Sequence, residues 1–394
     1  MAQPLLIWDP AMLRYDLGAQ HPFHPLRWEL TWLLADSLGV TSGLELTAPA
    51  PASDDVLRMV HSPAYIEAVK RGSEAGVIGA IGHGLGTADN PVFPGMHDAA
   101  ALIAGGSVAA AHAIAHREVD RAVNIAGGLH HAMPDSASGF CVYNDAALAI
   151  ATLLADGVTK IAYVDVDVHH GDGVQRAFYD DPRVLTVSLH ETPLSLWPGT
   201  GFVTESGRGA AGGTAVNIPL PAGTGDAAWL RAFQAVVPAV VREFRPQVLV
   251  TQHGADSHWE DPLADLNLTI DGQLASYRLL RDLAGEVAGG RWLALGGGGY
   301  SVVRVVPRAW THLLALVTDR DIDPATGIGD DWIAAAISAK STEPPPESMS
   351  ENGGQPVEFE PWDGQDATPV DHVISAVRRE IFPLYGLDPY DPRD

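Results

Sequence analysis

Residues 163–173 read YVDVDVHHGDG, a run that begins as an apolar β-strand and ends in three aspartates and two adjacent histidines. The two-residue period of a strand places Asp165, Asp167 and His169 on one face and the intervening valines on the other. Because buried carboxylates need partners, carboxylates and an imidazole on a shared face predict a metal site. Taken singly, each residue also fits a polar loop or the N-cap of a helix from about residue 173. His170 falls on the opposite face, and we expect it to be structural.

The segments around this stretch predict an α/β fold. Short runs rich in Val and Ile alternate with longer segments rich in Ala and Leu, which is typical of parallel strands joined by crossover helices. We therefore expect a three-layer α/β/α architecture with a mostly parallel central sheet. The expected strands are 5–8, 122–126, 161–166, 184–189, 215–220, 247–252 and 292–297. The expected helices are 26–38, 98–116, 145–155, 226–244, 273–288 and 302–316, several with Asn or Asp at the N-cap position.

The organisation of the chain favours a single domain over residues 1–394, although its length also allows two ordinary domains. No internal repeat is visible. Residues 341–368 are rich in Pro, Glu, Ser and Gly and predict an extended or flexible excursion from the core. Residues 369–382 have apolar residues at helical spacing and predict a terminal helix that packs back on the body.

Composition restricts the partners and the compartment. The formal net charge is -25, which argues against nucleic-acid binding, because phosphate backbones are bound by clustered Lys and Arg. Cys141 is the only cysteine, so no intramolecular disulfide forms and a reducing cytoplasm fits best. We expect neither a signal peptide nor any segment that approaches the length of a membrane-spanning helix. The sequence leaves the oligomeric state open.

Other reactive residues follow the remaining expected strands. A zinc site needs about three protein ligands and one open position, and Asp256 in HGAD is the best candidate for the third ligand beside Asp167 and His169. His253 and His258 are rivals for that role. In a parallel sheet these residues gather at the carboxyl ends of the strands, where ligands bind.

The adjacent histidines His130 and His131 suit acid–base catalysis, and Asp165 and Asp172 are the carboxylates available to orient them. Filling a polar loop is an equally good interpretation of the two histidines alone. Tyr300 follows four consecutive glycines and suits hydrogen bonding to a developing oxyanion. The glycines also fit a plain tight turn, but they lack the spacing of a dinucleotide-binding fingerprint.

Taken together, the motifs resemble the zinc-dependent histone-deacetylase-like family of the arginase–deacetylase fold, and within it the bacterial acetoin-utilization deacetylases. The resemblance spans about residues 20–317. The matching segments, in the order of the family, are GGLHHA, ASGFCVYND, YVDVDVHHGDGVQRAF, TVSLH, PGTG, GAD and LGGGGY.

The resemblance implies a role for each matching residue. The zinc ligands are Asp167, His169 and Asp256, with Fe²⁺ as an alternative ion. The catalytic residues are His130, His131, Asp165, Asp172 and Tyr300. The residues around the substrate are Asp89 at the rim, Gly139, Phe140 and Trp197 along the acyl-lysine channel, and Arg27 near the acetate exit. The residues at a structural potassium site are Asp165, Asp167, His169, Ser188 and Leu189.

Two departures from the family pattern bear on these roles. Trp197 stands where many relatives carry Phe, which should narrow or reshape the channel. His253 stands where relatives often carry an aliphatic residue, and we expect it to serve packing.

The implied activity is metal-dependent hydrolysis of acetyl-lysine amides in proteins, with His131 as the base. The alternatives are deacetylation of acetylpolyamines or other small acylated amines, a binuclear manganese ureohydrolase, and a non-catalytic acyl-lysine binder. An acidic surface suits a cationic substrate or product in each of the amine reactions.

Overall fold

The computed structural model describes residues 3–74, 76–77, 79–339 and 344–394. Its strands form one sheet in the order β2-β1-β3-β8-β7-β4-β5-β6, and every pair of neighbours is parallel. The strands are β1 (Leu5–Ile7), β2 (Leu46–Thr47), β3 (Arg121–Asn124), β4 (Ile161–Asp165), β5 (Val184–Glu191), β6 (Ala215–Leu220), β7 (Val248–Gln252) and β8 (Trp292–Leu295). The expected α/β class with a parallel sheet is confirmed, and only the two-residue edge strand β2 was not predicted.

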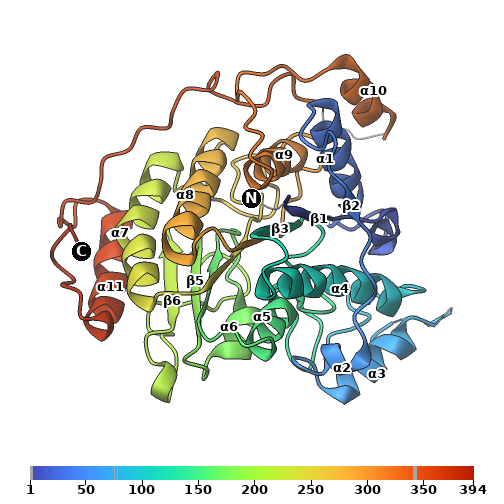
Figure 1. Ribbon diagram of the computed structural model, residues 1–394, viewed down its shortest axis with the longest axis horizontal. Coiled ribbons are helices and arrows are strands. Elements are labelled where there is room, and N and C mark those ends of the chain that lie inside the picture. The colour runs from blue at the N-terminus through green and yellow to red at the C-terminus, as the bar shows by residue number, and fades with distance from the viewer. Residues whose placement is uncertain (1–2, 75, 78, 340–343) are drawn as a thin grey trace.

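Helices cover both faces of this sheet (Figure 1). Helices α4, α5 and α6 pack on one side, and α7, α8, α9 and α11 on the other. The helices are α1 (Leu26–Ser37), α2 (Asp54–Leu57), α3 (Pro63–Gly72), α4 (Met96–Ala115), α5 (Asp145–Ala155), α6 (Asp172–Phe178), α7 (Asp226–Phe244), α8 (Ile270–Ala288), α9 (Val306–Val317), α10 (Asp330–Ser338) and α11 (Pro369–Ile381).

The expected helices are present, but some of their starts differ. Asn144 is the N-cap of α5, as its position predicts. Asp98 and Asp226 instead lie inside the first turn of α4 and α7, where a carboxylate is favoured by the helix dipole. Helix α8 begins at Ile270, three residues before the expected start, because Thr269 provides the N-cap.

Helix α4 corrects the expectation about membrane-spanning length. The helix has 20 residues, and an 18-residue window of it has a mean hydropathy of 1.4, so it is long and apolar enough to cross a membrane by length and composition alone. Within this window, 72% is buried inside the fold, where the helix packs on α5 and β3. Two of its glycines allow the segment after β2 and strand β1 to approach closely: a Cβ on Gly105 would lie 1.9 Å from the carbonyl oxygen of Ala50, and one on Gly106 would lie 2.7 Å from Ile7. Its apolar character is therefore that of a core helix.

The C-terminal region is anchored to the body. Residues 341–343 lie outside the described part, and residues 344–368 form neither helix nor strand. Met349 is nevertheless fully buried and Trp362 is 5% exposed, so this excursion is packed rather than simply flexible. Helix α11 begins at a capping box between Thr368 and Asp371 and packs on α7 and β6. These contacts support our proposal that the whole chain forms one domain.

Candidate active site

The aspartates of the 163–173 segment are arranged by local hydrogen bonds. The strand period predicts that Asp165, Asp167 and His169 share one face of a strand. That reason is wrong for Asp167 and His169, because strand β4 ends at Asp165. Instead, Asp165 Oδ1 accepts from the backbone N–H of Asp167 (3.0 Å), and Asp167 Oδ1 accepts from that of His169 (3.0 Å). These successive side-chain-to-backbone turns bring the same residues together beyond the end of the strand.

Asp167, His169 and Asp256 form a buried cluster with the spacing of metal ligands. His169 Nδ1 lies 3.3 Å from Asp167 Oδ1 and 3.1 Å from Asp256 Oδ2. Ligands on a tetrahedral zinc ion are about 3.3 Å apart, given metal–ligand bonds of about 2.0–2.2 Å. The remaining carboxylate oxygens accept backbone N–H groups of Gly298 (2.7 Å) and Val168 (3.0 Å). The donor set and its support therefore fit one small divalent ion.

Glycines make room for these carboxylates. A Cβ on Gly254 would lie 2.1 Å from Asp167 Oδ2, and a Cβ on Gly298 would lie 2.0 Å from Asp256 Oδ2. Any larger residue at either position would displace a candidate ligand. Of the four glycines before Tyr300, Gly297 and Gly298 thus lie against the candidate metal ligands.

The two rival histidines lie outside the cluster. His253 packs edge-on against Tyr277, with ring centroids 4.6 Å apart, and burial lowers its pKa to about 3. His258 donates from Nε2 to the Glu351 carboxylate at 3.1 Å and accepts from the backbone of Glu260 at Nδ1. Both serve as structural residues, which agrees with the packing role expected for His253.

The loop that carries His130 and His131 follows β3 and is held by the start of α5. Asp145 accepts from the backbone N–H groups of Gly128 and Leu129, while the Asn144 side chain donates to the carbonyl oxygens of His130 and Ala132. Sequence reasoning did not identify Asn144 or Asp145 as supports of this loop. Their adjacency at an N-cap within ASGFCVYND was the available signal.

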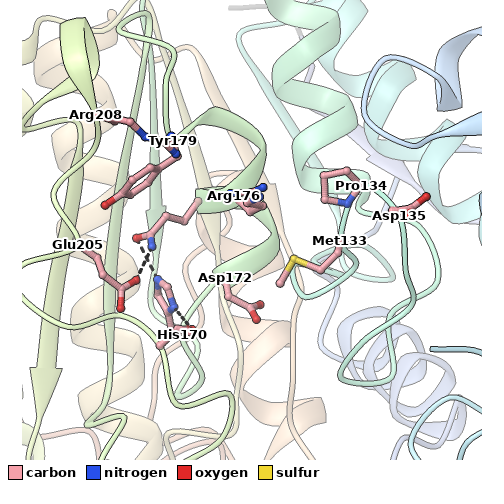
Figure 2. A pocket seen from close by; sticks show the side chains of 11 residues that line it. Met133, Pro134, Asp135, His170, Asp172, Arg176, Tyr179, Glu205 and Arg208 are labelled. Carbon is pink, nitrogen blue, oxygen red and sulfur yellow. Dashed lines mark hydrogen bonds between the residues drawn. The ribbon is translucent and has the colours of Figure 1, made fainter. Parts of the chain in front are cut away.

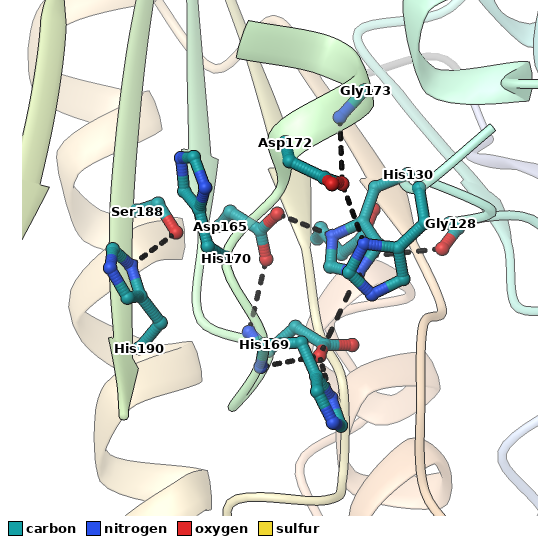
Figure 3. A network of polar contacts seen from close by, with 12 residues as sticks. Gly128, His130, Asp165, His169, His170, Asp172, Gly173, Ser188 and His190 are labelled. Carbon is teal, nitrogen blue, oxygen red and sulfur yellow. Dashed lines mark hydrogen bonds and ion pairs between the residues drawn. The ribbon is translucent and has the colours of Figure 1, made fainter. Parts of the chain in front are cut away.

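Each histidine of the pair has its own carboxylate (Figure 3). His130 Nδ1 donates to Asp165 Oδ2 at 2.7 Å, and His131 Nδ1 donates to Asp172 Oδ1 at 2.7 Å. The Nε2 atoms of the two rings lie 2.9 Å apart. The carboxylate pairings expected from the sequence are thus the ones that the structure contains.

Electrostatics give the two histidines different charge states. Burial lowers the pKa of His130, but the charges of Asp165 and Asp167 outweigh it and raise that pKa to about 9. For His131, burial and the neighbouring His130 charge together hold the pKa well below its ordinary value. His131 is therefore neutral at pH 7, with its proton on Nδ1 and the lone pair on Nε2.

A cavity of about 310 Å³ opens onto this network. Its lining comprises Asp89, His131, Gly139, Phe140, His169, Leu196, Trp197, Leu263 and Tyr300. The rings of Phe140 and Tyr300 pack edge-on with their centroids 5.7 Å apart. The rings of Trp197 and His131 also pack edge-on, with their centroids 4.6 Å apart. A Cβ on Gly139 would lie 2.5 Å from the Trp197 ring, so glycine is required there. All expected channel residues line this one cavity.

Tyr15 supports the cavity wall and was not predicted. Phe140 has a positive φ of 69°, an unfavourable conformation for an aromatic residue. The Tyr15 hydroxyl donates to the Phe140 carbonyl oxygen at 2.7 Å and accepts from the backbone N–H of Val142 at 3.0 Å. Tyr15 lies 125 residues away in sequence, so no local pattern indicates this contact.

Arg27 lies behind the tyrosine rather than in the cavity. Its guanidinium is buried, donates to the carbonyl oxygen of Gly299 at 3.1 Å and stacks over Phe23 at 3.9 Å. It thereby supports the residue that precedes Tyr300. Burial raises the pKa of Tyr300 well above its ordinary value, so its hydroxyl is protonated at neutral pH.

His170 faces a second and larger cavity, of about 470 Å³, on the other side of Asp172 (Figure 2). Its ring nitrogens contact Thr200 Oγ1 at 2.8 Å and Gln175 Oε1 at 3.1 Å. His170 is turned toward His190 and away from His130 (Figure 3). This position agrees with the structural role expected for His170. This larger cavity contains neither the metal cluster nor Tyr300 among its lining residues.

The residues expected at a potassium site come from the end of β4, from the segment that follows it and from the neighbouring strand β5. Asp165 pairs in register with Ser188, and Leu189 follows directly. Ser188 Oγ lies 2.9 Å from His190 Nδ1. The strand pairing brings these residues together, and their role in potassium binding stays a prediction.

Comparison with known proteins identifies this arrangement. A protein-family model described as the histone deacetylase domain matches residues 21–317. The chain belongs to the histone deacetylase family. Members of this deacetylase family are typically metal-dependent hydrolases, and the family resemblance drawn from the sequence is confirmed.

Relatives of this deacetylase include acetoin utilization proteins. It is 41% identical over 335 residues to the acetoin utilization protein AcuC of Bacillus subtilis (strain 168), covering 84% of this chain and 86% of that protein. The chain is also 38% identical over 319 residues to AcuC of Staphylococcus aureus (strain MSSA476), and the match covers 80% of this chain and 82% of that protein.

Solved structures of histone deacetylase homologues share the fold. A homologue complexed with SAHA matches with a TM-score of 0.82 and 29% identity, over 96% of this chain and 99% of that one. A homologue from Aquifex aeolicus matches with a TM-score of 0.80 and 28% identity, over 96% and 99%.

Proposed function

We propose that this deacetylase hydrolyses acetyl-lysine amides in cytoplasmic proteins and releases acetate and free lysine. The observation that carries the proposal is the convergence of His131, His169 and Tyr300 on one cavity of about 310 Å³. A base, a metal-binding imidazole and a hydrogen-bond donor for the oxyanion are the groups that metal-assisted amide hydrolysis requires.

Asp167, His169 and Asp256 would hold the metal, Zn²⁺ or alternatively Fe²⁺, which when bound polarises the acyl carbonyl. Burial lowers the pKa of His169, but the carboxylates of Asp167 and Asp256 outweigh burial and raise this pKa to about 10. His169 would therefore have to lose a proton in order to bind a metal. A binuclear manganese site needs further bridging carboxylates, whereas Asp165 and Asp172 are already bonded to histidines. This favours the deacetylase over a ureohydrolase.

The histidines and the tyrosine then have separate roles. Neutral His131 accepts the proton of the attacking water at Nε2 and later returns a proton to the departing amine. His130, held protonated by Asp165, stabilises negative charge as it develops. Protonated Tyr300 donates a hydrogen bond to the oxyanion. A non-catalytic acyl-lysine binder would not need this complete set.

The rim of the cavity bears on the substrate. Asp89 is exposed there and suits a hydrogen bond with the substrate backbone, while Trp197 is 46% exposed beside the entrance. We propose that Gly139, Phe140 and Trp197 enclose the acyl-lysine stem, and that Arg27 supports the acetate exit. Asp165, Asp167, His169, Ser188 and Leu189 are proposed to bind structural K⁺.

The test is turnover of acetyl-lysine peptides by wild type, Tyr300→Phe and chelator-treated protein, alongside acetylspermidine as a small acylated amine. We expect peptide turnover to fall at least tenfold in Tyr300→Phe and to vanish after metal removal. Undiminished turnover in either case would refute the assigned roles, and a preference for acetylspermidine would replace the protein substrate. One metal equivalent that is lost in Asp167→Asn is expected at Asp167, His169 and Asp256, whereas a ureohydrolase would bind two manganese ions at this cluster.

A further inference from the structure

A second group of metal-ligating side chains lies where helices α4 and α5 end. It consists of His112, His116 and Asp156, and one ring nitrogen of each histidine and one carboxylate oxygen lie within 4.8 Å of one another. His112 Nδ1 forms a short contact with Asp156 Oδ2, and His116 Nδ1 lies 3.9 Å from the same oxygen. These separations lie on either side of the value of about 3.3 Å for ligands on one tetrahedral zinc ion, so small side-chain adjustments would bring all three atoms to ligand spacing.

The local structure favours a cation at this position. His112 and His116 are four residues apart, so they project from the same face of α4. His116 is the C-cap of α4 and Asp156 is the C-cap of α5, so the negative ends of two helix dipoles meet here. The side chains of His112 and His116 are 50% and 58% exposed, which leaves both rings free to adjust and an outer position open to water.

A third group shows the opposite arrangement. His258, Glu260 and Glu351 also lie within ligand distance of one another. Their carboxylates, however, are paired with guanidinium groups: Glu260 with Arg304 at 2.9 Å and Glu351 with Arg308 at 2.9 Å. Cations of the protein already occupy the positions that a metal would take. The Asp156 carboxylate, in contrast, forms ion pairs only with the two histidines among the described residues.

We propose that His112, His116 and Asp156 bind a divalent transition metal such as Zn²⁺, in a site separate from the catalytic cavity. Two neutral imidazoles and one carboxylate supply three ligands, and water completes the tetrahedron. Binding replaces the His116 hydrogen bond to the carbonyl oxygen of His112 and fastens the end of α4 to the end of α5. The site needs no catalytic residue.

The experiment measures zinc bound by the tag-free, metal-free protein after equilibrium dialysis against buffered micromolar Zn²⁺ at pH 7.5. We expect two equivalents in wild type and one in both His112→Ala/His116→Ala and Asp156→Asn. His372→Ala, which removes another exposed histidine, is the matched control and should retain two. Zinc added beyond the first equivalent, at a hundredfold excess over its dissociation constant, should raise Tm by about 3 °C in wild type and in His372→Ala, but not in His112→Ala/His116→Ala or Asp156→Asn.

The two zinc sites are separated by the same measurement. Asp167→Asn should lose the catalytic equivalent and keep the one at His112, whatever the substrate of the deacetylase proves to be. A single equivalent in wild type under saturating zinc, or two equivalents in the His112→Ala/His116→Ala protein, would refute the second site. In that case the cluster is an ion pair between His112 and Asp156.

Discussion

Replacing Asp172 by Asn tests the charge behind His131. Asp172 Oδ1 accepts from His131 Nδ1 at 2.7 Å and from the backbone N–H of Gly173 at 2.9 Å. The amide oxygen of Asn can accept both bonds, so Asp172→Asn keeps the His131 tautomer and removes only the negative charge. A hydrogen bond to a charged partner contributes about 1.5–3 kcal/mol and one to a neutral partner about 0.5–1.5 kcal/mol. The difference of about 1–1.5 kcal/mol predicts a kcat about 5- to 12-fold lower.

The pH dependence gives the sign of the effect. A carboxylate beside His131 stabilises its protonated form, so losing the charge lowers the pKa of His131. The acidic limb of kcat/KM against pH should therefore move to lower pH in Asp172→Asn. Asp172→Ala leaves the Nδ1–H without an acceptor and frees the tautomer, and its activity should fall further, by about 100-fold or more.

Steady-state kinetics on an acetyl-lysine peptide between pH 5 and pH 9 measure both effects. Asp180→Asn is the matched control, because Asp180 lies in the same part of the chain, is exposed and pairs only with Arg208 among the described residues. Wild-type kcat in Asp172→Asn, or an acidic limb displaced to higher pH, would refute the role assigned to this carboxylate.

Three further predictions test the glycines and the C-terminal region. Gly298→Ala places a methyl group 2.0 Å from Asp256 Oδ2, so zinc affinity measured by dialysis should fall at least tenfold while Gly285→Ala, at an uncrowded position, retains it. Gly139→Ala crowds Trp197 and His131, so the KM for an acetyl-lysine peptide should rise with an unchanged circular dichroism spectrum. Glu351→Gln leaves the buried Arg308 without its counter-charge and should lower the free energy of unfolding by about 2–3 kcal/mol in urea titrations, whereas the neighbouring Glu347→Gln should not. Although burial raises the pKa of Glu351, His258 and Arg308 outweigh burial and hold it at about 2, so this stabilisation is present above pH 4.5 and is lost as the pH falls toward 2.

The sheet could be predicted because strands buried on both faces are continuous apolar runs. Strand β2 has two residues and half-exposed or exposed side chains, which is too little for a pattern. Helix α3 was missed although Ser62 and Pro63 form a recognisable N-terminal signal. Helix α10 buries few residues, since only Trp332 and Ala336 on it are buried, and its sequence shows a correspondingly weak apolar stripe.

The candidate ligands could be found because each lies in a short motif that follows a strand, whereas several groups that support the site are distant in sequence. The position of Phe140 depends on Tyr15, 125 residues earlier, and the loop of His130 is held by Asn144 and Asp145. These contacts exist only after the sheet has formed. Sequence patterns thus locate the reactive atoms better than the groups that fix their orientation.

The region beyond residue 317, where the family match ends, reaches back to the metal cluster. Glu351 accepts from His258, two residues after Asp256, and from Arg308 on α9, while its backbone N–H donates to Asp271 at 2.8 Å on α8. His258 is fully buried, so without Glu351 its Nε2–H would lose its acceptor, at a cost of about 1–3 kcal/mol. The loop that presents Asp256 is therefore held from both sides: by the glycines before Tyr300 on one, and on the other by a segment beyond the residues that the family model matches.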